Sequence, residues 1–285
     1  MTTSVLAARA ADRPGVVAAG IGDWEPFWLG SPPRTLYAAL HPAPGIHSTG
    51  VVLVPPLLDE LPRSRRFITE VAGELAGMGL PSLRFDFHGT GDSSGRGDEF
   101  DFDSMRADLD LAVAELRART GVARLVLLAW RGAALAVGAW RSCGGMADLV
   151  VLWEPVCDGA AWLRELVDAD VEARKVLPPP RPGVPRTGGP DDGQLMGYRA
   201  SPRLRMQLAR ARLDPDLAGG DVPVWAILRP DGGDAPIAAT RSWSLPESAP
   251  KFAGGVSMDA TLFLTPPMRG FVRELGAALC AGAWT

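Results

Sequence analysis

Short apolar runs alternate with amphipathic stretches over most of the chain. The runs have the length of strands buried on both faces, and they stand at 50–54, 80–87, 124–130, 148–153 and 222–228. Apolar residues recur at helical spacing at 64–78 and from about 103 to 119. Strands alternating with helices predict right-handed βαβ units. We therefore expect an α/β fold with a mostly parallel, doubly wound sheet.

The pattern changes between 159 and 217. Two further helices are predicted there, at about 160–176 and 202–213, and the stretch between them at 178–193 is too rich in proline and glycine for a packed element. We predict that 159–217 is a cap or lid insertion with a loop at 178–193. The core is then formed by 23–158 and 218–285, and 1–22 is a mobile leader. An outer strand is expected at 34–40, a last strand at 258–264 and a closing helix at 266–281.

Composition limits the classes of function. The 285 residues suit one α/β domain with an insertion, and 47% of them are hydrophobic. With 29 basic and 33 acidic residues the net charge is −4, which argues against a nucleic-acid partner. The three cysteines lack metal-like spacing, and we predict no metal and no cofactor. Without a signal-peptide core or an apolar run of about 18 residues, the chain is expected to be cytoplasmic, with no membrane span.

The stretch 124–136, RLVLLAWRGAALA, is an apolar run, a bend and a small-residue helix. This order is typical of a nucleophile elbow, in which a serine stands at the centre of Gly-x-Ser-x-Gly. Here the five positions are Ala129, Trp130, Arg131, Gly132 and Ala133. Arginine stays charged and has no nucleophilic atom. The elbow is therefore predicted without its nucleophile.

These features resemble the α/β-hydrolase superfamily. The loop LRFDFHGTGDSSG resembles its Asp-x-x-Gly-x-Gly-x-Ser loop, with matches at Asp86, Gly89, Gly91 and Ser93. Five segments also follow the order seen in the exosortase A system-associated hydrolases of type 2: PPLLDELPRSRR, the loop after Asp86, the Trp-Arg-Gly elbow, LWEPVCDG and GYRASP. The resemblance spans about 24–280 and includes the elbow arginine. It implies an α/β-hydrolase fold with a cap, and a bacterial biosynthetic operon that supplies a protein partner.

A serine hydrolase needs a nucleophile, a histidine base and a carboxylate that orients the histidine. Arg131 occupies the nucleophile position. All three histidines precede the elbow, and none follows the last predicted strand. Asp234, in the stretch that also contains Asp231, best matches the acid position. Two of three triad members are therefore missing, and ordinary serine-hydrolase chemistry is not expected.

Other residues are candidates to replace the missing triad members. Cys157 follows a predicted strand at the edge where such folds bind ligands, yet a buried structural thiol is the favoured interpretation. Asp86 and His88 are either an acid–base pair or, as we favour, partners in loop-ordering hydrogen bonds. Pro55 and Pro56 replace the usual His-Gly pair of the oxyanion loop, and a proline has no N–H to donate.

Arg131 is expected at the N-terminus of a helix, where backbone N–H groups and the helix dipole favour anions. Two roles remain open: binding an acidic ligand through its planar fork, or pairing with an internal carboxylate, for which Glu154 and Asp234 are the candidates. The charged cluster from Asp59 to Arg66 forms either salt bridges at a helix start or part of a binding rim.

Three functional hypotheses follow. The first is a non-catalytic or accessory binding protein with a degenerate triad, which holds a small-molecule, acyl or peptidyl ligand, anionic in the version that uses Arg131. Its binding residues are Arg131, Trp130, Gly132, Glu154 and Trp162. The second is an unconventional hydrolase or acyltransferase acting on an ester, thioester or amide. The third is an interaction module with a closed pocket. Whether the chain is an enzyme depends on a nucleophile–base pair within about 2.6–3.2 Å.

Overall fold

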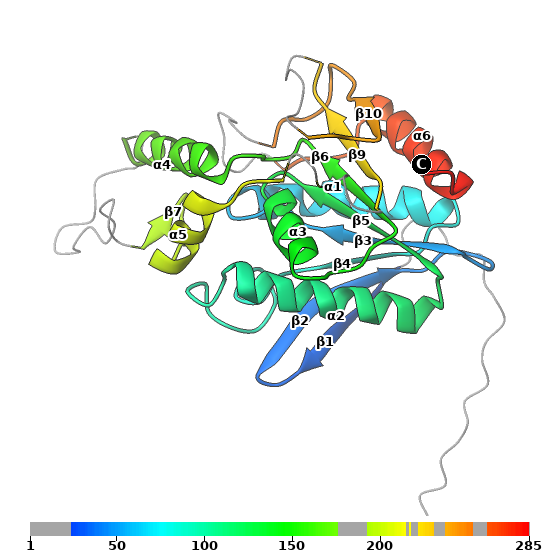
Figure 1. Cartoon of the computed structure of the whole chain (residues 1–285), viewed down its shortest axis with the longest axis horizontal. Coiled ribbons are helices and arrows are strands. Elements are labelled where there is room, and N and C mark those ends of the chain that lie inside the picture. The colour runs from blue at the N-terminus through cyan, green and yellow to red at the C-terminus, as the bar shows by residue number, and fades with distance from the viewer. Residues whose placement is uncertain are drawn as a thin grey trace, which may run out of the picture.

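An eight-stranded sheet runs through the molecule (Figure 1). The computed structural model describes residues 24–175, 193–214, 217, 222–230, 237–252 and 261–284. The sheet has the order β1-β2-β4-β3-β5-β6-β9-β10, in which the strands from β4 to β10 are parallel and β1 and β2 form an antiparallel hairpin at one edge. The strands are β1 (Glu25–Ser31), β2 (Arg34–His41), β3 (Thr49–Val54), β4 (Ser82–Phe85), β5 (Arg124–Trp130), β6 (Leu149–Trp153), β9 (Val224–Leu228) and β10 (Arg241–Ser244).

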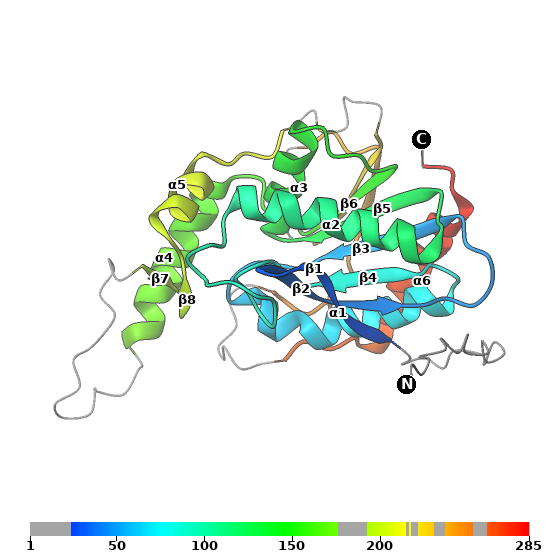
Figure 2. The same ribbon diagram turned by 90° about the horizontal axis from the view of Figure 1, so that it is seen from below.

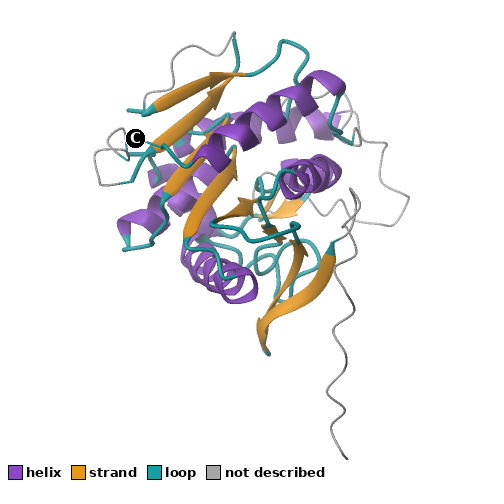
Figure 3. Cartoon of the chain, turned by 90° about the vertical axis from the view of Figure 1, so that its right-hand side faces the viewer, coloured by secondary structure: helices purple, strands orange, loops and turns teal. Residues whose placement is uncertain are grey.

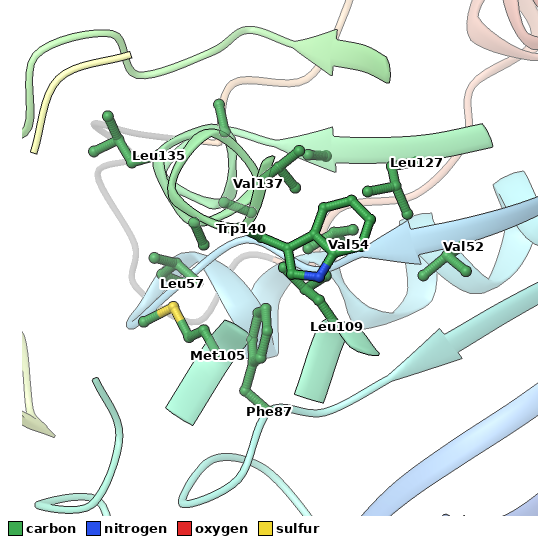
Figure 4. Packing of buried hydrophobic residues seen from close by; sticks show 14 of the residues in the cluster. Val52, Val54, Leu57, Phe87, Met105, Leu109, Leu127, Leu135, Val137 and Trp140 are labelled. Carbon is green, nitrogen blue, oxygen red and sulfur yellow. The ribbon is translucent and has the colours of Figure 1, made fainter. Parts of the chain in front are cut away.

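Helices cover both faces of the sheet (Figures 2 and 3). One face is covered by α2 (Phe102–Thr120) and α3 (Ala133–Ser142), the other by α1 (Glu60–Gly77) and α6 (Pro266–Ala281). Side chains of the central strands alternate between two cores. Leu127 packs on the α2–α3 side, where Figure 4 shows it near Val137 and Trp140, whereas Leu128 packs on the α1–α6 side. The doubly wound arrangement predicted from the alternating elements is confirmed.

The helix starts differ from the predicted ones for local reasons. Helix α1 begins at Glu60, four residues before the predicted position, because a proline in the first turn removes only an N–H that has no helical partner. Helix α2 is capped by Asp101, whose side chain accepts from the backbone N–H of Ser104, and it ends at Gly121 in the left-handed region. The helix thus begins one residue before the predicted start at about 103.

The helices and strands described between β6 and β9 lie beyond one end of the sheet (Figure 2). Its elements are α4 (Gly159–Lys175), the short hairpin β7 (Gln194–Leu195) and β8 (Tyr198–Arg199), and α5 (Pro202–Arg210). The hairpin was not predicted, and α5 ends three residues earlier than expected. Most of the loop 178–193 lies outside the described residues, as does the leader 1–22. The division into core and cap stays a prediction.

The predicted last strand at 258–264 is wrong where the structure describes it, since 261–264 is not a strand, and 258–260 lies outside the described residues. The sheet ends in β10 instead, parallel to β9. The sequence of β10 is RSWS, and most of it is exposed. An exposed edge strand needs no apolar run, so the hydrophobic pattern gave no sign of it.

Asp108 of α2 forms hydrogen bonds with two other segments on the α2–α3 side of the sheet. Its side chain is fully buried. Oδ1 accepts from Nε and Nη2 of Arg34 at 3.0 and 2.5 Å, and Oδ2 accepts from the backbone N–H of His88 at 2.8 Å. One carboxylate thus joins α2, the start of β2 and the loop after β4.

We expect Asp108→Ala to lower the free energy of unfolding by about 3 kcal/mol, because the hydrogen bonds to a charged group are lost and a buried N–H is left without its partner. Urea unfolding measures the change. Asp103→Ala is the matched control: it removes an exposed carboxylate of the same helix that pairs with Arg203, and is expected to cost less than about 1 kcal/mol. Equal losses in the two variants would contradict the role of Asp108.

Candidate functional site

Three neighbouring strands end in strained backbone. Leu58 follows β3 with φ of 55°, Arg131 follows β5 with φ of 54°, and Glu154 follows β6 with φ of 46°. Residues other than glycine rarely occupy this left-handed region, and each costs about 1 kcal/mol or more. Such strain gathers at functional sites. It marks the carboxyl edge of the sheet, where doubly wound folds bind ligands.

The turn after β5 has the geometry of a nucleophile elbow. Strand β5 ends at Trp130, Arg131 takes the strained position and α3 begins at Ala133. The backbone of Arg131 is held on both sides: its N–H donates to the carbonyl of Trp153 at 2.9 Å, and its carbonyl accepts from the N–H of Val156 at 3.2 Å. The turn therefore follows the backbone course expected of such an elbow, with the side chain of Arg131 at its strained position.

The guanidinium of Arg131 forms an internal ion pair. Nε donates to Oε1 of Glu60 at 3.1 Å, and Nη1 donates to the backbone carbonyl of Glu154 at 3.3 Å. The side chain of Arg131 is 17% exposed and that of Glu60 only 2%. Glu60 comes from the first turn of α1, which follows the neighbouring strand β3.

Glu60 is a partner of Arg131 that the sequence did not suggest. Glu154, one of the expected partners, accepts from Arg131 through its backbone carbonyl, and its carboxylate pairs with Nε of Arg229. Asp234, the other candidate and the residual catalytic acid, lies outside the described residues, as does Asp231. The signal that could have indicated Glu60 is the parallel pairing of β3 and β5, because it brings together the residues that follow the two strands.

Burial is the largest influence on the pKa values of Glu60 and of its neighbour Asp59. It raises the pKa of Glu60 to about 7, although Arg131 opposes the shift; the nearby carboxylates of Asp59 and Glu154 add to it. Burial also raises the pKa of Asp59, against the influence of Arg63 and Arg131. Oδ1 of Asp59 and Oε2 of Glu60 are both buried and have no hydrogen-bond partner in the described part of the chain.

Side chains from the segment between β6 and β9 cover the elbow. Trp162 of α4 is 3% exposed, and its ring lies so close to Gly132 that a Cβ added there would stand 2.4 Å from it. Burial raises the pKa of Tyr198 in β8, and the charge of Asp59 raises it further. The elbow arginine, the two acids and these two aromatic residues thus form one neighbourhood.

The substitutes for a serine–histidine pair do not assemble in the described structure. Asp86 and His88 do not pair with each other: Oδ2 of Asp86 accepts from Arg65 at 2.7 Å, and the ring of His88 lies 3.4 Å from Glu99. The favoured loop-ordering role fits these contacts. Burial raises the pKa of the Cys157 thiol, which disfavours a thiolate nucleophile. The other two histidines contact Arg84, in the case of His41, and the carbonyl of Ala43, in the case of His47.

Trp130 is a correction to the expected set of binding residues. It is fully buried on the α1–α6 side of the sheet, where its ring packs on Trp153 at 5.7 Å between centroids. Side chains alternate along a strand, so the residue before Arg131 points into the core. Trp130 therefore supports the elbow from below and does not line a site.

A groove of about 290 Å³ lies away from the elbow, between α3 and the end of α5. Its lining includes Leu135, Gly138, Gln207 and Arg210, and neither Arg131 nor Glu60 belongs to it. Among the described residues, no group of three or more His, Cys, Asp or Glu is placed to hold a metal ion. Nor does any described helix have the length and apolarity to cross a membrane.

The sheet order, the two helix layers and the elbow define an α/β-hydrolase fold. Est1E from Butyrivibrio proteoclasticus, solved with ferulic acid bound, has a TM-score of 0.59 and 14% identity over 90% of this chain and 99% of that chain. The proline iminopeptidase-related protein TTHA1809 from Thermus thermophilus has a TM-score of 0.56 and 19% identity, covering 91% of this chain and 99% of that chain.

An esterase domain of a Rhodothermus marinus protein has a TM-score of 0.54 and 17% identity over 91% of this chain and 98% of that chain. At such identities the likeness concerns the fold, which hosts many functions. No family model and no curated protein matched the sequence.

We expect Gly132→Ala to destabilise the protein by about 1–3 kcal/mol, because the new methyl group overlaps the ring of Trp162. Backbone strain does not contribute, since Gly132 has φ of −61°. Thermal unfolding measures the loss, which should shrink when Trp162→Leu is added. Gly77→Ala, at a helical glycine with open space around it, is the control and should be neutral or slightly stabilising. If Gly132→Ala destabilises the Trp162→Leu variant as much as it destabilises the wild type, the contact between Gly132 and Trp162 is contradicted.

Glu60 is expected to make stability fall as pH rises. Its pKa is about 7 in the folded protein, against 4.5 for an ordinary glutamate. Between these values the folded protein holds a proton that the unfolded chain has lost, so the stabilisation present at low pH is lost through this window. The loss is at most roughly 3 kcal/mol. The charged groups that face Glu60 are Arg131, Asp59 and Glu154.

Urea unfolding of wild type and Glu60→Gln at about pH 5 and about pH 8 measures this effect. The difference between the two proteins should change with pH by that amount. His41, with a pKa lowered to about 4 by burial and Arg84, acts in the opposite direction and is common to both proteins, so it cancels. If the free energies of unfolding of the two proteins change with pH in parallel, the raised pKa of Glu60 is refuted.

Proposed function

We propose that this chain is a non-catalytic, accessory binding protein built on the α/β-hydrolase fold. The observation that carries the proposal is the ion pair between Arg131, at the nucleophile position, and Glu60. A nucleophile at this position attacks a carbonyl, whereas a paired guanidinium cannot attack anything. The triad is degenerate in this interpretation, and the elbow serves as a rigid element of a binding site.

The surroundings of the elbow support the same proposal. Trp162 packs on Gly132, the residue whose backbone N–H follows the nucleophile position and would form half of an oxyanion hole. Pro55 and Pro56 weaken the other half. No histidine contacts the elbow in the described residues, so a nucleophile there would lack its usual base, and the oxyanion of a tetrahedral intermediate would lack well-placed donors.

The sequence resemblance to exosortase A system-associated hydrolases of type 2 supports a place in a bacterial biosynthetic operon. In that setting we propose a cytoplasmic protein that holds an acyl or peptidyl ligand for a partner encoded nearby. Arg131, Gly132, Glu154 and Trp162 are the proposed binding residues.

One observation favours a second function. A buried carboxylate that changes protonation near neutral pH is typical of a general base, and Glu60 is such a group beside the elbow. An unconventional hydrolase or acyltransferase would use Glu60 to activate water or a hydroxyl for attack on an ester, thioester or amide.

A panel of activated esters, thioesters and anilides separates the two functions. We expect the wild type to show no turnover above that of buffer, and expect the same of Arg131→Ser, because a restored serine still lacks its histidine. Turnover that Glu60→Gln abolishes would establish the second function. Turnover abolished by Cys157→Ala, or surviving both substitutions, would also refute the non-catalytic proposal.

A further inference from the structure

Two carboxylate oxygens at the elbow are buried without a donor. Oδ1 of Asp59 and Oε2 of Glu60 have no hydrogen-bond partner among the described residues, and the Glu60 side chain is 2% exposed. A buried acceptor without a partner costs about 1–3 kcal/mol, more when it is charged. Two such atoms on consecutive residues, at the carboxyl edge of the sheet, are the most unsatisfied polar group of the elbow neighbourhood.

The fold does not use either oxygen. Asp59 stands at the N-cap of α1, where an aspartate usually accepts from the backbone N–H groups of the first turn, yet its side chain makes no capping hydrogen bond. Glu60 gives Oε1 to Arg131 and keeps Oε2 unpaired. A structural role therefore accounts for one oxygen of Glu60 and leaves Oε2 of Glu60 and Oδ1 of Asp59 unexplained.

The charge of the neighbourhood selects the kind of ligand. Arg131 is engaged by Glu60 and by the carbonyl of Glu154, and Arg229 neutralises the Glu154 carboxylate. Asp59 forms no ion pair in the described residues, although the charges of Arg63 and Arg131 both act on it. An anion would have to displace Glu60 from Arg131 while lying beside Asp59, and like charges at this depth repel. A cation with several donors supplies hydrogen bonds to both oxygens, and its attraction to the two carboxylates offsets its repulsion by Arg63 and Arg131.

We propose that the elbow site binds a primary ammonium group, which donates hydrogen bonds to Oδ1 of Asp59 and Oε2 of Glu60. This inference rests on the proposed binding function and replaces the anionic ligand of the sequence hypothesis. An ammonium has three N–H donors and one positive charge, so it satisfies both oxygens. Trp162 packs on Gly132 of the elbow, and the charge of Asp59 acts on Tyr198, so we expect these two rings to meet the carbon chain that bears the ammonium group.

Calorimetric titration of the full-length protein with n-butylammonium tests the proposal, with n-butanol and butyrate as matched neutral and anionic probes. We expect saturable binding of the ammonium and at least about tenfold weaker binding of the other two, equivalent to about 1.4 kcal/mol. Equal binding of n-butanol, stronger binding of butyrate, or no binding of n-butylammonium would each overturn the proposal.

Site variants locate the binding. Asp59→Asn and Glu60→Gln should each weaken n-butylammonium binding by about tenfold or more, since each removes a charge-assisted hydrogen bond. Asp92→Asn is the control: it alters an exposed carboxylate that pairs with Arg65 at 3.1 Å, and should leave the affinity unchanged. If Glu60→Gln does not fold, as judged by circular dichroism, Asp59→Asn still decides. Unchanged affinity in Asp59→Asn would refute the site.

Proton release on binding is a further measurement. It is expected only if the ligand lies beside Glu60, and not if Glu60 has a purely structural role. A bound cation lowers the pKa of Glu60, whose value in the unliganded protein is about 7. Titration at about pH 7 in buffers of different ionisation enthalpy should therefore show release of about half a proton on binding. No release would show that the ammonium does not lie beside Glu60.

Comparison of n-butylammonium with the dipeptide amide Ala-Ala-NH2 distinguishes the source of the ammonium. Tighter binding of the dipeptide indicates a peptide N-terminus, and tighter binding of butylammonium a small amine; both support the site. The binding test and the turnover test of the proposed function can fail independently of each other. Ester turnover with ammonium binding would refute only the non-catalytic role, and absence of both turnover and ammonium binding would refute only this inference.

Discussion

The contact between Arg131 and Glu60 links the two parts of the chain on which the site depends. Glu60 begins α1 after β3, and Arg131 is the elbow residue after β5, so one ion pair joins two neighbouring crossovers at the carboxyl edge of the sheet. Removing either partner would leave a charge in a place that water scarcely reaches. The raised pKa of Glu60 has the same origin: burial outweighs the attraction of a single guanidinium.

The sheet makes this arrangement rigid. Trp130 and Ala129 pack into opposite cores, and the strained residue Arg131 follows directly after them. Trp162 then covers the turn from the side of α4. Backbone strain, a buried pair and an aromatic cover therefore act on the same few residues, and none of them requires a chemical reaction. The proposed binding role is compatible with all three features.

Much of the fold follows from the sequence, because buried strands and amphipathic helices have distinct periods. The elbow was also recognisable, since an apolar run, a bend and small residues are local features. The partner of Arg131 was not: Glu60 is 71 residues away, and its proximity depends on the order of strands in the sheet. The contact of Trp162 with Gly132 is tertiary in the same way. Strand β10 was missed because an exposed edge needs no hydrophobic pattern.

The strained backbone at the elbow has an evolutionary meaning. Catalysis is the usual reason for holding a side chain in the left-handed region at the end of β5, yet here the conformation persists with an arginine. A fold can therefore retain a strained backbone turn, which is energetically unfavourable, while the side chain that the turn presents is exchanged. Under the proposed function, a change of ligand chemistry at this turn would need new side chains and no change of architecture.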